Sequence, residues 1–262
     1  MPEPSEPMAL PPFEFVDAHC HVDLFPNPAD LVAEAEAERV FTIAVTNAPF
    51  VFDHTLALTL RSSLVHPALG LHPELVGSRG HEVTSLCERL KDVRFVGEVG
   101  LDYTTSDRAL RAEQRRVFDR VLESCARAGG KVLTVHSRRA ASDVVSAIGR
   151  TFPCSLILHW FTGSVRELEA ATAAGVYFSV NASMVESKNG RNLISAMPRD
   201  RVLTESDGPF VRRAGGPASP RNMRFVVESL AGQWGIPSGE AALMIRRNFA
   251  SCVGASNSAP VP

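Results

Sequence analysis

The sequence predicts a (β/α)8 barrel, the TIM-barrel architecture, built as one domain. Eight short apolar runs rich in β-branched residues occur along the 262-residue chain, and segments with helical spacing separate them. The runs are continuously apolar rather than alternating, which is typical of parallel strands buried on both faces. Repeated β and α units of this number and spacing favour a single barrel.

The expected strands and helices alternate throughout. Several helical segments end at glycine, a frequent helix C-terminus. The expected strands cover residues 13–19, 41–47, 64–72, 94–100, 131–136, 155–160, 176–181 and 201–207. The expected helices include residues 28–40, 109–130, 139–150 and 165–175, and residues 222–249 are expected to form two closing helices.

A doubly wound open sheet is the structural alternative to the barrel. In that fold the first strand runs into a glycine-rich turn that binds a dinucleotide. Here the first strand is followed by AHCHVDLFPNP, which has no such glycines and therefore favours the barrel. We expect the barrel domain to cover residues 13–250, with flexible segments at 1–12 and 251–262.

The composition is that of an ordinary globular protein. Hydrophobic residues make up 45%, charged residues 21%, and the formal net charge is −2. A protein that coats long nucleic acids normally carries a basic excess, so this balance excludes a generic polyanion binder. A phosphate-bearing substrate would have to be bound by a local cluster of residues.

Cysteine usage and the N-terminal segment indicate a cytoplasmic protein. The five cysteines are scattered without CxxC spacing, which argues against a disulfide framework or a zinc ribbon. The first residues lack the basic start and apolar core of a signal peptide. No apolar run approaches the roughly 20 residues that cross a bilayer, so we expect no membrane association.

The segment VDAHCHVD places His19 and His21 two positions apart at the end of the first expected strand. Alternate residues of a strand project from one face, so both imidazoles would share one target. Cys20 would point to the opposite face and pack there. By itself such a pair does not distinguish a metal site from two polar residues where a strand ends.

Further candidate ligands stand at the ends of other expected strands. Glu98 ends the fourth, His136 the fifth, His159 the sixth and Asp207 the eighth. Because functional residues of these barrels gather where the strands end, the four histidines and two carboxylates should meet at one mouth. Nitrogen and oxygen ligands without thiolates suit zinc, manganese or another divalent ion, and such sites perform hydrolysis.

The motifs, taken in order, resemble those of the TatD-type metal-dependent deoxyribonucleases, within the amidohydrolase-like barrels. The matching segments are VDAHCHVD, ALGLHPE, VGEVGLDY, VHSRRA, HWFTGS and LTESDGPF, which span about residues 13 to 250. The residues of four segments are most similar to those of the TatD-like member of the Qat anti-phage defence cassette. These segments are VTNAP, GGKVLTVHSRRA, HWFTGS and TESDGPFV. Trp160, Ser206, Gly208 and the pair Gly129-Gly130 depart from the usual family residues, and none of these changes removes a metal ligand.

The resemblance implies a site for two divalent metal ions, zinc, manganese or magnesium, and assigns a role to each ligand. Asp207 is expected to act as the general base, since its carboxylate can touch metal and water together. From their positions in the sequence, Asp17 and Asp102 are candidates to orient a ligand ring or a buried arginine from behind, and a hydrogen bond to the backbone at the strand end is the alternative role for each. The implied ligands are His19, His21 and Asp207 for one ion, His136 and His159 for the other, and Glu98 as the catalytic bridge.

The rim of the same mouth offers contacts for DNA that is single-stranded or has a free end. Ser137, Arg138 and Arg139 are expected to open a helix, whose free N–H groups favour an anion. Trp160 is a candidate for base stacking. The other candidate substrate contacts are His72 after the third strand, Lys188 after the seventh and Arg212 after the eighth.

Three functions are compatible with these residues. The leading one is a nuclease that works at DNA ends, and the resemblance implies a 3'-to-5' exonuclease in anti-phage defence with other proteins of the cassette as partners. A second is hydrolysis of small-molecule esters or aminoacyl-RNA ester bonds, because the same site would activate water against a carbonyl. A third is a partner-binding subunit of a defence complex, which the loss of a ligand would support, and none is lost. Glu98 on the fourth strand, in place of lysine, disfavours the carbamylated-lysine hydrolases.

Overall fold

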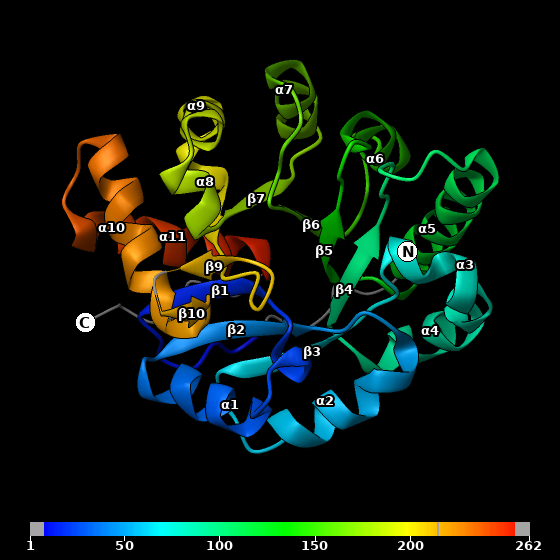
Figure 1. The fold of residues 1–262 in the computed structure, drawn as a ribbon, viewed down its shortest axis with the longest axis horizontal. Coiled ribbons are helices and arrows are strands. Elements are labelled where there is room, and N and C mark those ends of the chain that lie inside the picture. Colours follow the sequence, from blue (N-terminus) through cyan, green and yellow to red (C-terminus); the bar gives the residue numbers. More distant parts are fainter. Residues whose placement is uncertain (1–7, 214, 255–262) are drawn as a thin grey trace.

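A computed structural model describes residues 8–213 and 215–254 of the chain, and the expected barrel is present in it. Eight parallel strands pair in chain order from β1 to β8 and form a nearly closed barrel (Figure 1). The strands are β1 Phe15–Cys20, β2 Val40–Val45, β3 Val65–Leu69, β4 Phe95–Gly100, β5 Val132–His136, β6 Ser155–His159, β7 Tyr177–Val180 and β8 Val202–Thr204.

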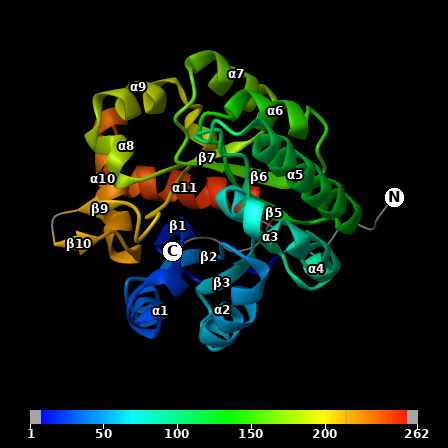
Figure 2. The same cartoon turned by 45° about the vertical axis from the view of Figure 1, so that its right-hand side comes forward.

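Helices alternate with the strands and cover the outside of the barrel (Figures 1 and 2). The two closing helices are α10 and α11, and α11 packs against both β8 and β1, where the barrel closes. The helices are α1 Pro28–Ala37, α2 Phe52–Thr59, α3 Val76–Arg79, α4 Val83–Arg89, α5 Arg108–Ala128, α6 Ala141–Ile148, α7 Val165–Ala173, α8 Ala182–Glu186, α9 Lys188–Ala196, α10 Met223–Trp234 and α11 Ser238–Cys252.

The end of the barrel where the strands begin is filled by aromatic side chains. Phe249 of α11 contacts Phe13 and Phe41, with ring centroids 6.0 and 4.7 Å apart. Phe41 also packs against Phe95 at the start of β4. This apolar plug stabilises one end of the barrel and leaves the carboxyl ends of the strands as the end that carries polar side chains.

Hydrogen bonds join the segment after β8 to β1 across the closing seam. The backbone N–H of Ser206 donates to Oδ1 of Asp17 at 2.8 Å, and that of Asp207 donates to the carbonyl of His19 at 2.8 Å. The N–H of His21 in turn donates to the carbonyl of Gly208 at 2.9 Å. The seam therefore places Asp207 beside both histidines of the first strand.

Several elements are shorter than the sequence pattern predicts. β3 ends at Leu69 and β8 at Thr204, so His72 and Asp207 lie in the loops that follow. The helix expected to open at Ser137 begins instead at Ala141, after a turn. Arg139 in this turn has a φ of 55°, and such a left-handed conformation cannot continue into a right-handed helix.

The edges of the domain also differ in detail. A short hairpin of β9 Arg212–Arg213 and β10 Gly216–Pro217, which the apolar pattern does not predict, follows β8. Met8 and Leu10 pack partly against the core, and α11 continues to Cys252. Residues 1–7 and 255–262 of the expected flexible ends lie outside the described residues.

Among the helices described here, none is long and apolar enough to cross a membrane.

Candidate metal centre

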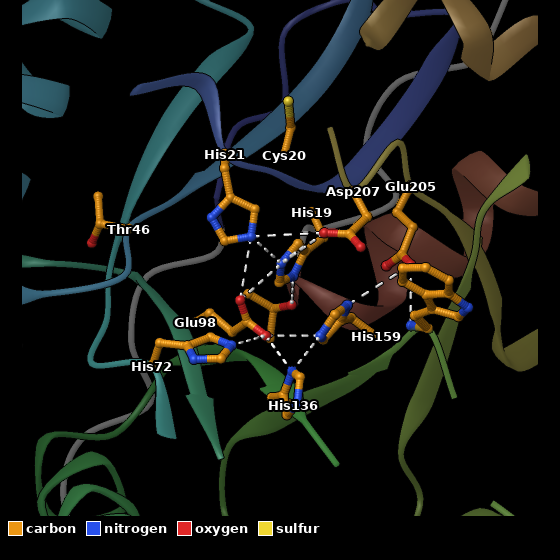
Figure 3. Close-up of polar contacts among 12 residues, drawn as sticks. His19, Cys20, His21, Thr46, His72, Glu98, His136, His159, Glu205 and Asp207 are labelled. Carbon is orange, nitrogen blue, oxygen red and sulfur yellow. Dashed lines mark hydrogen bonds and ion pairs between the residues drawn. The ribbon is translucent and has the colours of Figure 1, made fainter. Parts of the chain in front are cut away.

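The carboxyl ends of five strands bring the six expected ligands together (Figure 3). His136 and His159 are the last residues of β5 and β6, and Glu98 lies within β4. The remaining three, His19, His21 and Asp207, lie at the seam where β1 and the segment after β8 meet. The side chains converge on one point because parallel strands of a barrel end at the same mouth.

One group of ligand atoms forms around His19 and His21. Their Nε2 atoms lie 3.2 Å apart. Oε2 of Glu98 lies 3.5 Å from the first of these nitrogens and 3.3 Å from the second. Oδ1 of Asp207 completes the group at 3.8 and 3.7 Å from the same atoms.

A second group forms around the other oxygen of Glu98. Oε1 lies 2.7 Å from Nδ1 of His136 and 2.8 Å from Nε2 of His159, and these two nitrogens are 3.2 Å apart. Nε2 of His72 approaches the same oxygen at 3.4 Å. Glu98 therefore presents one oxygen to each group, which is the position of a bridging ligand.

The chemistry of these atoms fits divalent cations. The side chains of Glu98 and Asp207 are only 2% and 4% exposed, and in the described chain their ion-pair partners are all imidazoles rather than lysine or arginine. Buried carboxylates need a compensating positive charge. Three sets of these side chains hold their ligand atoms within 4.8 Å of one another, as a metal site requires. Neutral imidazole and carboxylate ligands are those of zinc and manganese sites.

The shared burial couples the charges of the site. Burial alone would raise the pKa of Glu98, but the nearby His72, His159 and His19 and the contact with His136 hold it well below its usual range. Burial would lower the pKa of His159, but Glu98 and Glu205 raise it well above the ordinary value. Without metal, protons therefore supply part of the positive charge that the carboxylates require.

Asp207 is held in an uncommon backbone conformation. Its φ of 46° lies in the left-handed region, which few residues other than glycine occupy. Its carbonyl accepts the N–H groups of Phe210 and Val211 at 2.9 and 3.0 Å, in addition to the seam bond from its own N–H. Burial raises the pKa of its carboxyl well above the usual range, against the charge of His159. The turn thus aims a basic carboxylate at the first ligand group.

Polar side chains contact the rings of two candidate ligands, His136 and His19, from behind. Oδ2 of Asp102 lies 2.8 Å from Nε2 of His136, which fits the orienting role among those considered for Asp102. Oγ1 of Thr134 lies 2.7 Å from Nδ1 of His19, a contact that the sequence analysis missed. Thr134 stands two residues before His136 on β5, so the same alternation that was applied to the histidines could have found it.

Glu205 is a further buried carboxylate that the sequence analysis did not assign. It accepts the backbone N–H of Trp160 at 3.0 Å, the amide of Asn181 at 2.9 Å and the hydroxyl of Ser179. Its Oε1 also lies 3.9 Å from Nδ1 of His159. Trp160 has a φ of 37°, which is rare for a bulky residue, and Glu205 holds this turn directly after a ligand.

A family model described as TatD-related DNase matches residues 16–254. The chain belongs to the TatD-related DNase family. The expected resemblance to this family is therefore confirmed, and with it a metal-dependent hydrolase on a TIM barrel.

Named relatives and a solved structure agree with this TatD-family assignment. The human deoxyribonuclease TATDN3 is 28% identical over 257 residues, which cover 89% of this chain and 92% of that protein. The 3'-5' ssDNA/RNA exonuclease TatD of Pantoea vagans is 29% identical over 163 residues, 59% of each chain. The crystal structure of the TatD homologue YjjV from Escherichia coli superposes with a TM-score of 0.82 at 26% identity, covering 91% of this chain and 97% of that one.

Two residues next to the candidate ligands of this TatD-family site, Asp17 and Cys20, stabilise the surrounding structure: the first bonds to the backbone and the second packs in an apolar cluster. Of the roles considered for Asp17, the structure shows the hydrogen bond to the backbone: its Oδ1 accepts the N–H groups of His19 and Ser206, because the seam closes there. Burial raises the pKa of Asp17 to about 7. Cys20 is buried with Leu31 in a separate apolar cluster and points away from both histidines (Figure 3).

A pocket of about 430 Å3 in this TatD-family chain is lined by the candidate ligands His21, Glu98, His136, His159 and Asp207. Of the expected substrate contacts, His72, Ser137, Arg138 and Trp160 line it. Nε2 of His72 lies 3.4 Å from Oε1 of Glu98, so His72 stands among the candidate ligands and not only at the rim of the pocket. The expected contacts Arg139, Lys188 and Arg212 are exposed and do not line the pocket, since they lie on the left-handed turn, at the start of α9 and on the β9 hairpin.

Proposed function

We propose that this chain is a two-metal deoxyribonuclease that removes nucleotides from the 3' end of DNA. The observation that carries the proposal is the position of Glu98, with one oxygen facing each group of imidazoles. A carboxylate in that position can hold two cations side by side, which is the arrangement of many phosphodiester hydrolases. Zinc, manganese and magnesium are the candidate ions.

Family membership supports the phosphodiester substrate, and one relative supports the direction of cleavage. The Pantoea vagans relative is named as a 3'-5' exonuclease on single-stranded DNA and RNA. The pocket also suits a chain end, because its lining includes a single arginine, Arg138, and no lysine. A long duplex would need a track of several cations along its backbone.

Each ligand has a defined part in the proposed reaction. When bound, two divalent cations lower the pKa of a water molecule and offset the negative charge of the phosphodiester. Asp207 directs Oδ1 at the first group, so Oδ2 is the oxygen that takes the proton from the attacking water and passes it to the leaving 3' oxygen. The residues that would hold the ions are His19, His21 and Asp207 for one, His136 and His159 for the other, and Glu98 for both.

Substrate contacts follow from the pocket lining. Arg138 and Ser137 stand beside His136 and are proposed to bind the scissile or the adjacent phosphate. Trp160 is proposed to contact the terminal base, and His72 to contact either metal or phosphate. Arg139, Lys188 and Arg212 are exposed, and any role for them would be with DNA outside the pocket.

We also propose a setting in anti-phage defence, with proteins of the same cassette as partners. This setting is supported by the sequences of four segments, which resemble the TatD-like member of the Qat cassette: VTNAP, GGKVLTVHSRRA, HWFTGS and TESDGPFV. The test is protection of cells that express the cassette. Replacing Asp207 with alanine should abolish protection if the nuclease is required, and unchanged plaque counts would argue against this setting.

The activity is tested on purified protein with manganese, magnesium or zinc. Single-stranded DNA labelled at its 5' end should yield a ladder that shortens by one nucleotide at a time, while RNA, aminoacyl-RNA and carboxylic esters serve as competing substrates. His136→Ala and Asp207→Ala should each lower the rate by about 10²-fold or more. Exposed His81→Ala and Asp30→Ala are the matched controls. Faster hydrolysis of an ester than of any DNA would overturn the proposal.

A further inference from the structure

Phe210 is an exposed aromatic residue fixed beside the metal ligands. Phe210 is 58% exposed, although most large apolar residues in the described part of the chain are buried. Its ring contacts the ring of His21 edge to face, with centroids 5.0 Å apart and an interplanar angle of 89°. Its N–H is bonded to the carbonyl of Asp207. The ring is thus held at the mouth by two of the candidate ligands.

The backbone leading to Phe210 has little freedom to move the ring. A Cβ atom at Gly208 would lie 2.0 Å from the carbonyl oxygen of Ala218 and 2.8 Å from the ring of Phe25. The turn is therefore packed tightly against the hairpin side of the barrel and against the loop after β1. A ring presented to solvent on such a turn is preorganised for contact with a ligand.

Phe210 and Trp160 line the same pocket from different strands. Trp160 follows β6 and Phe210 follows β8, and both belong to the wall of the 430 Å3 cavity. Apolar Leu75 and the polar side chain of Asn47, whose Oδ1 is buried without a hydrogen-bond partner, are also in this wall. The wall thus combines aromatic faces with a free acceptor, as expected of a site for a planar ring that carries N–H groups.

We propose that Phe210 is the stacking platform for the unpaired terminal base of a DNA strand, and that it makes the enzyme select single-stranded ends. This inference rests on the proposed nuclease function and assigns recognition of the terminal base to one side chain. In a duplex, the terminal base is paired along its edge and stacked on one face. It can enter the pocket only after its pair opens, whereas a single strand offers the base directly.

The test separates base stacking from other effects by changing both the protein and the DNA. Phe210→Ala, Phe210→Leu and Phe210→Trp are compared with wild type on a single-stranded oligonucleotide and on the same oligonucleotide with an abasic 3' residue. Phe50→Ala is the matched control, since Phe50 is 60% exposed and does not line the pocket. Metal content of each variant is measured, because Phe210 contacts His21.

Stacking predicts a specific pattern in these measurements. Phe210→Ala should raise KM on the normal strand by roughly 5- to 100-fold with kcat nearly unchanged, because stacking binds substrate and transition state alike. Phe210→Trp should retain wild-type KM, and Phe210→Leu should fall between. On the abasic strand, wild type and Phe210→Ala should have the same KM. The preference of wild type for single strands over blunt duplex should shrink in Phe210→Ala.

Other results overturn the inference in distinguishable ways. An equal loss on normal and abasic strands would show that Phe210 supports the site and not the base. Unchanged kinetics of Phe210→Ala with active wild type would remove the stacking role while leaving the nuclease intact. Absence of DNA cleavage by wild type with every metal would remove the proposed function and this inference together.

Discussion

Oδ2 of Asp102 lies 2.8 Å from Nε2 of His136, while Nδ1 of the same ring lies 2.7 Å from Glu98. The imidazole is therefore held between two carboxylates at its two nitrogens. If Nε2 carries the proton and donates it to Asp102, the lone pair of Nδ1 faces the second ligand group. Oδ1 of Asp102 is fixed in turn by the N–H of Thr104 at 2.8 Å, so the ring orientation is set by the loop after β4.

Asp102→Asn is expected to weaken metal binding at the second group. The substitution keeps the size of the side chain but removes the charge that assists the hydrogen bond from His136, and loss of such a partner lowers metal affinity or activity by about 10- to 100-fold. Metal titration of the metal-free protein measures the change. Asp107→Asn is the control, because Asp107 caps α5 and asparagine caps helices equally well. Equal affinities for both variants would contradict the orienting role.

Thr134→Val is expected to weaken metal binding at the first group, while Thr134→Ser retains it. The hydroxyl 2.7 Å from Nδ1 of His19 can accept the ring proton and so keep Nε2 free as a ligand. Valine matches the shape of threonine without the hydroxyl, and serine keeps the hydroxyl. A loss of about 10-fold or more in metal affinity in the valine variant alone would support this role. Equal metal affinities of the valine and serine variants would show that the hydroxyl of Thr134 does not support metal binding and that Thr134 only packs against Gly97.

Metal binding at pH 7 is expected to release protons. In the metal-free protein the pKa of His159 is raised well above its ordinary value of 6.5, so its ring holds a proton that a cation must displace, and the raised pKa of Asp207 shifts that group toward its protonated form as well. The apparent affinity should therefore fall as the pH falls. Calorimetric titration in buffers of different ionisation enthalpy counts the protons. A heat that does not depend on the buffer would contradict the prediction.

The same shift has a consequence for stability. The pKa of His159 is raised in the folded state, so its protonation stabilises the metal-free fold fully below about pH 6.5, the unfolded value. That contribution is lost as the pH rises through the folded pKa. Thermal melts should therefore show that added metal stabilises the protein more at pH 9 than at pH 6. His159→Gln removes this titrating group and should reduce the pH dependence of the metal-free protein.

Glu205→Gln is expected to destabilise the protein and to disturb the site. Oε1 accepts a backbone N–H and an amide, and Oε2 accepts a hydroxyl. In the glutamine variant, either the NH2 group faces the two N–H donors, or the Ser179 hydroxyl must give up its bond and turn to accept from the NH2 group. A buried polar group left without its partner costs about 1 to 3 kcal/mol. Urea unfolding measures this cost, and the exposed substitution Glu169→Gln is the control. A midpoint equal to that of wild type would exclude the network as a source of stability.

Most of the fold followed from local patterns in the sequence. Each buried parallel strand is a continuous apolar run, so its place is readable without knowing its neighbours. Strand ends were less readable, as His72 and Asp207 show. Hydrogen bonding with a neighbouring strand, and a left-handed turn at Asp207, decide where pairing stops. The sequence pattern places the start of α6 too early, at Ser137 instead of Ala141. The cause is the left-handed conformation of Arg139, which its residue type does not indicate.

The sequence by itself determined the architecture and the identity of the candidate ligands, because strand-end histidines and carboxylates are brought together by any closed parallel barrel. Only the tertiary structure decided which atoms meet. Thr134 and His19 are 115 residues apart, and the contact of Glu205 with Trp160 joins the segments after different strands. Phe210 looked like an ordinary loop residue until the seam placed its ring against His21. Such contacts depend on side-chain direction and backbone turns in three dimensions, which spacing along a chain does not encode.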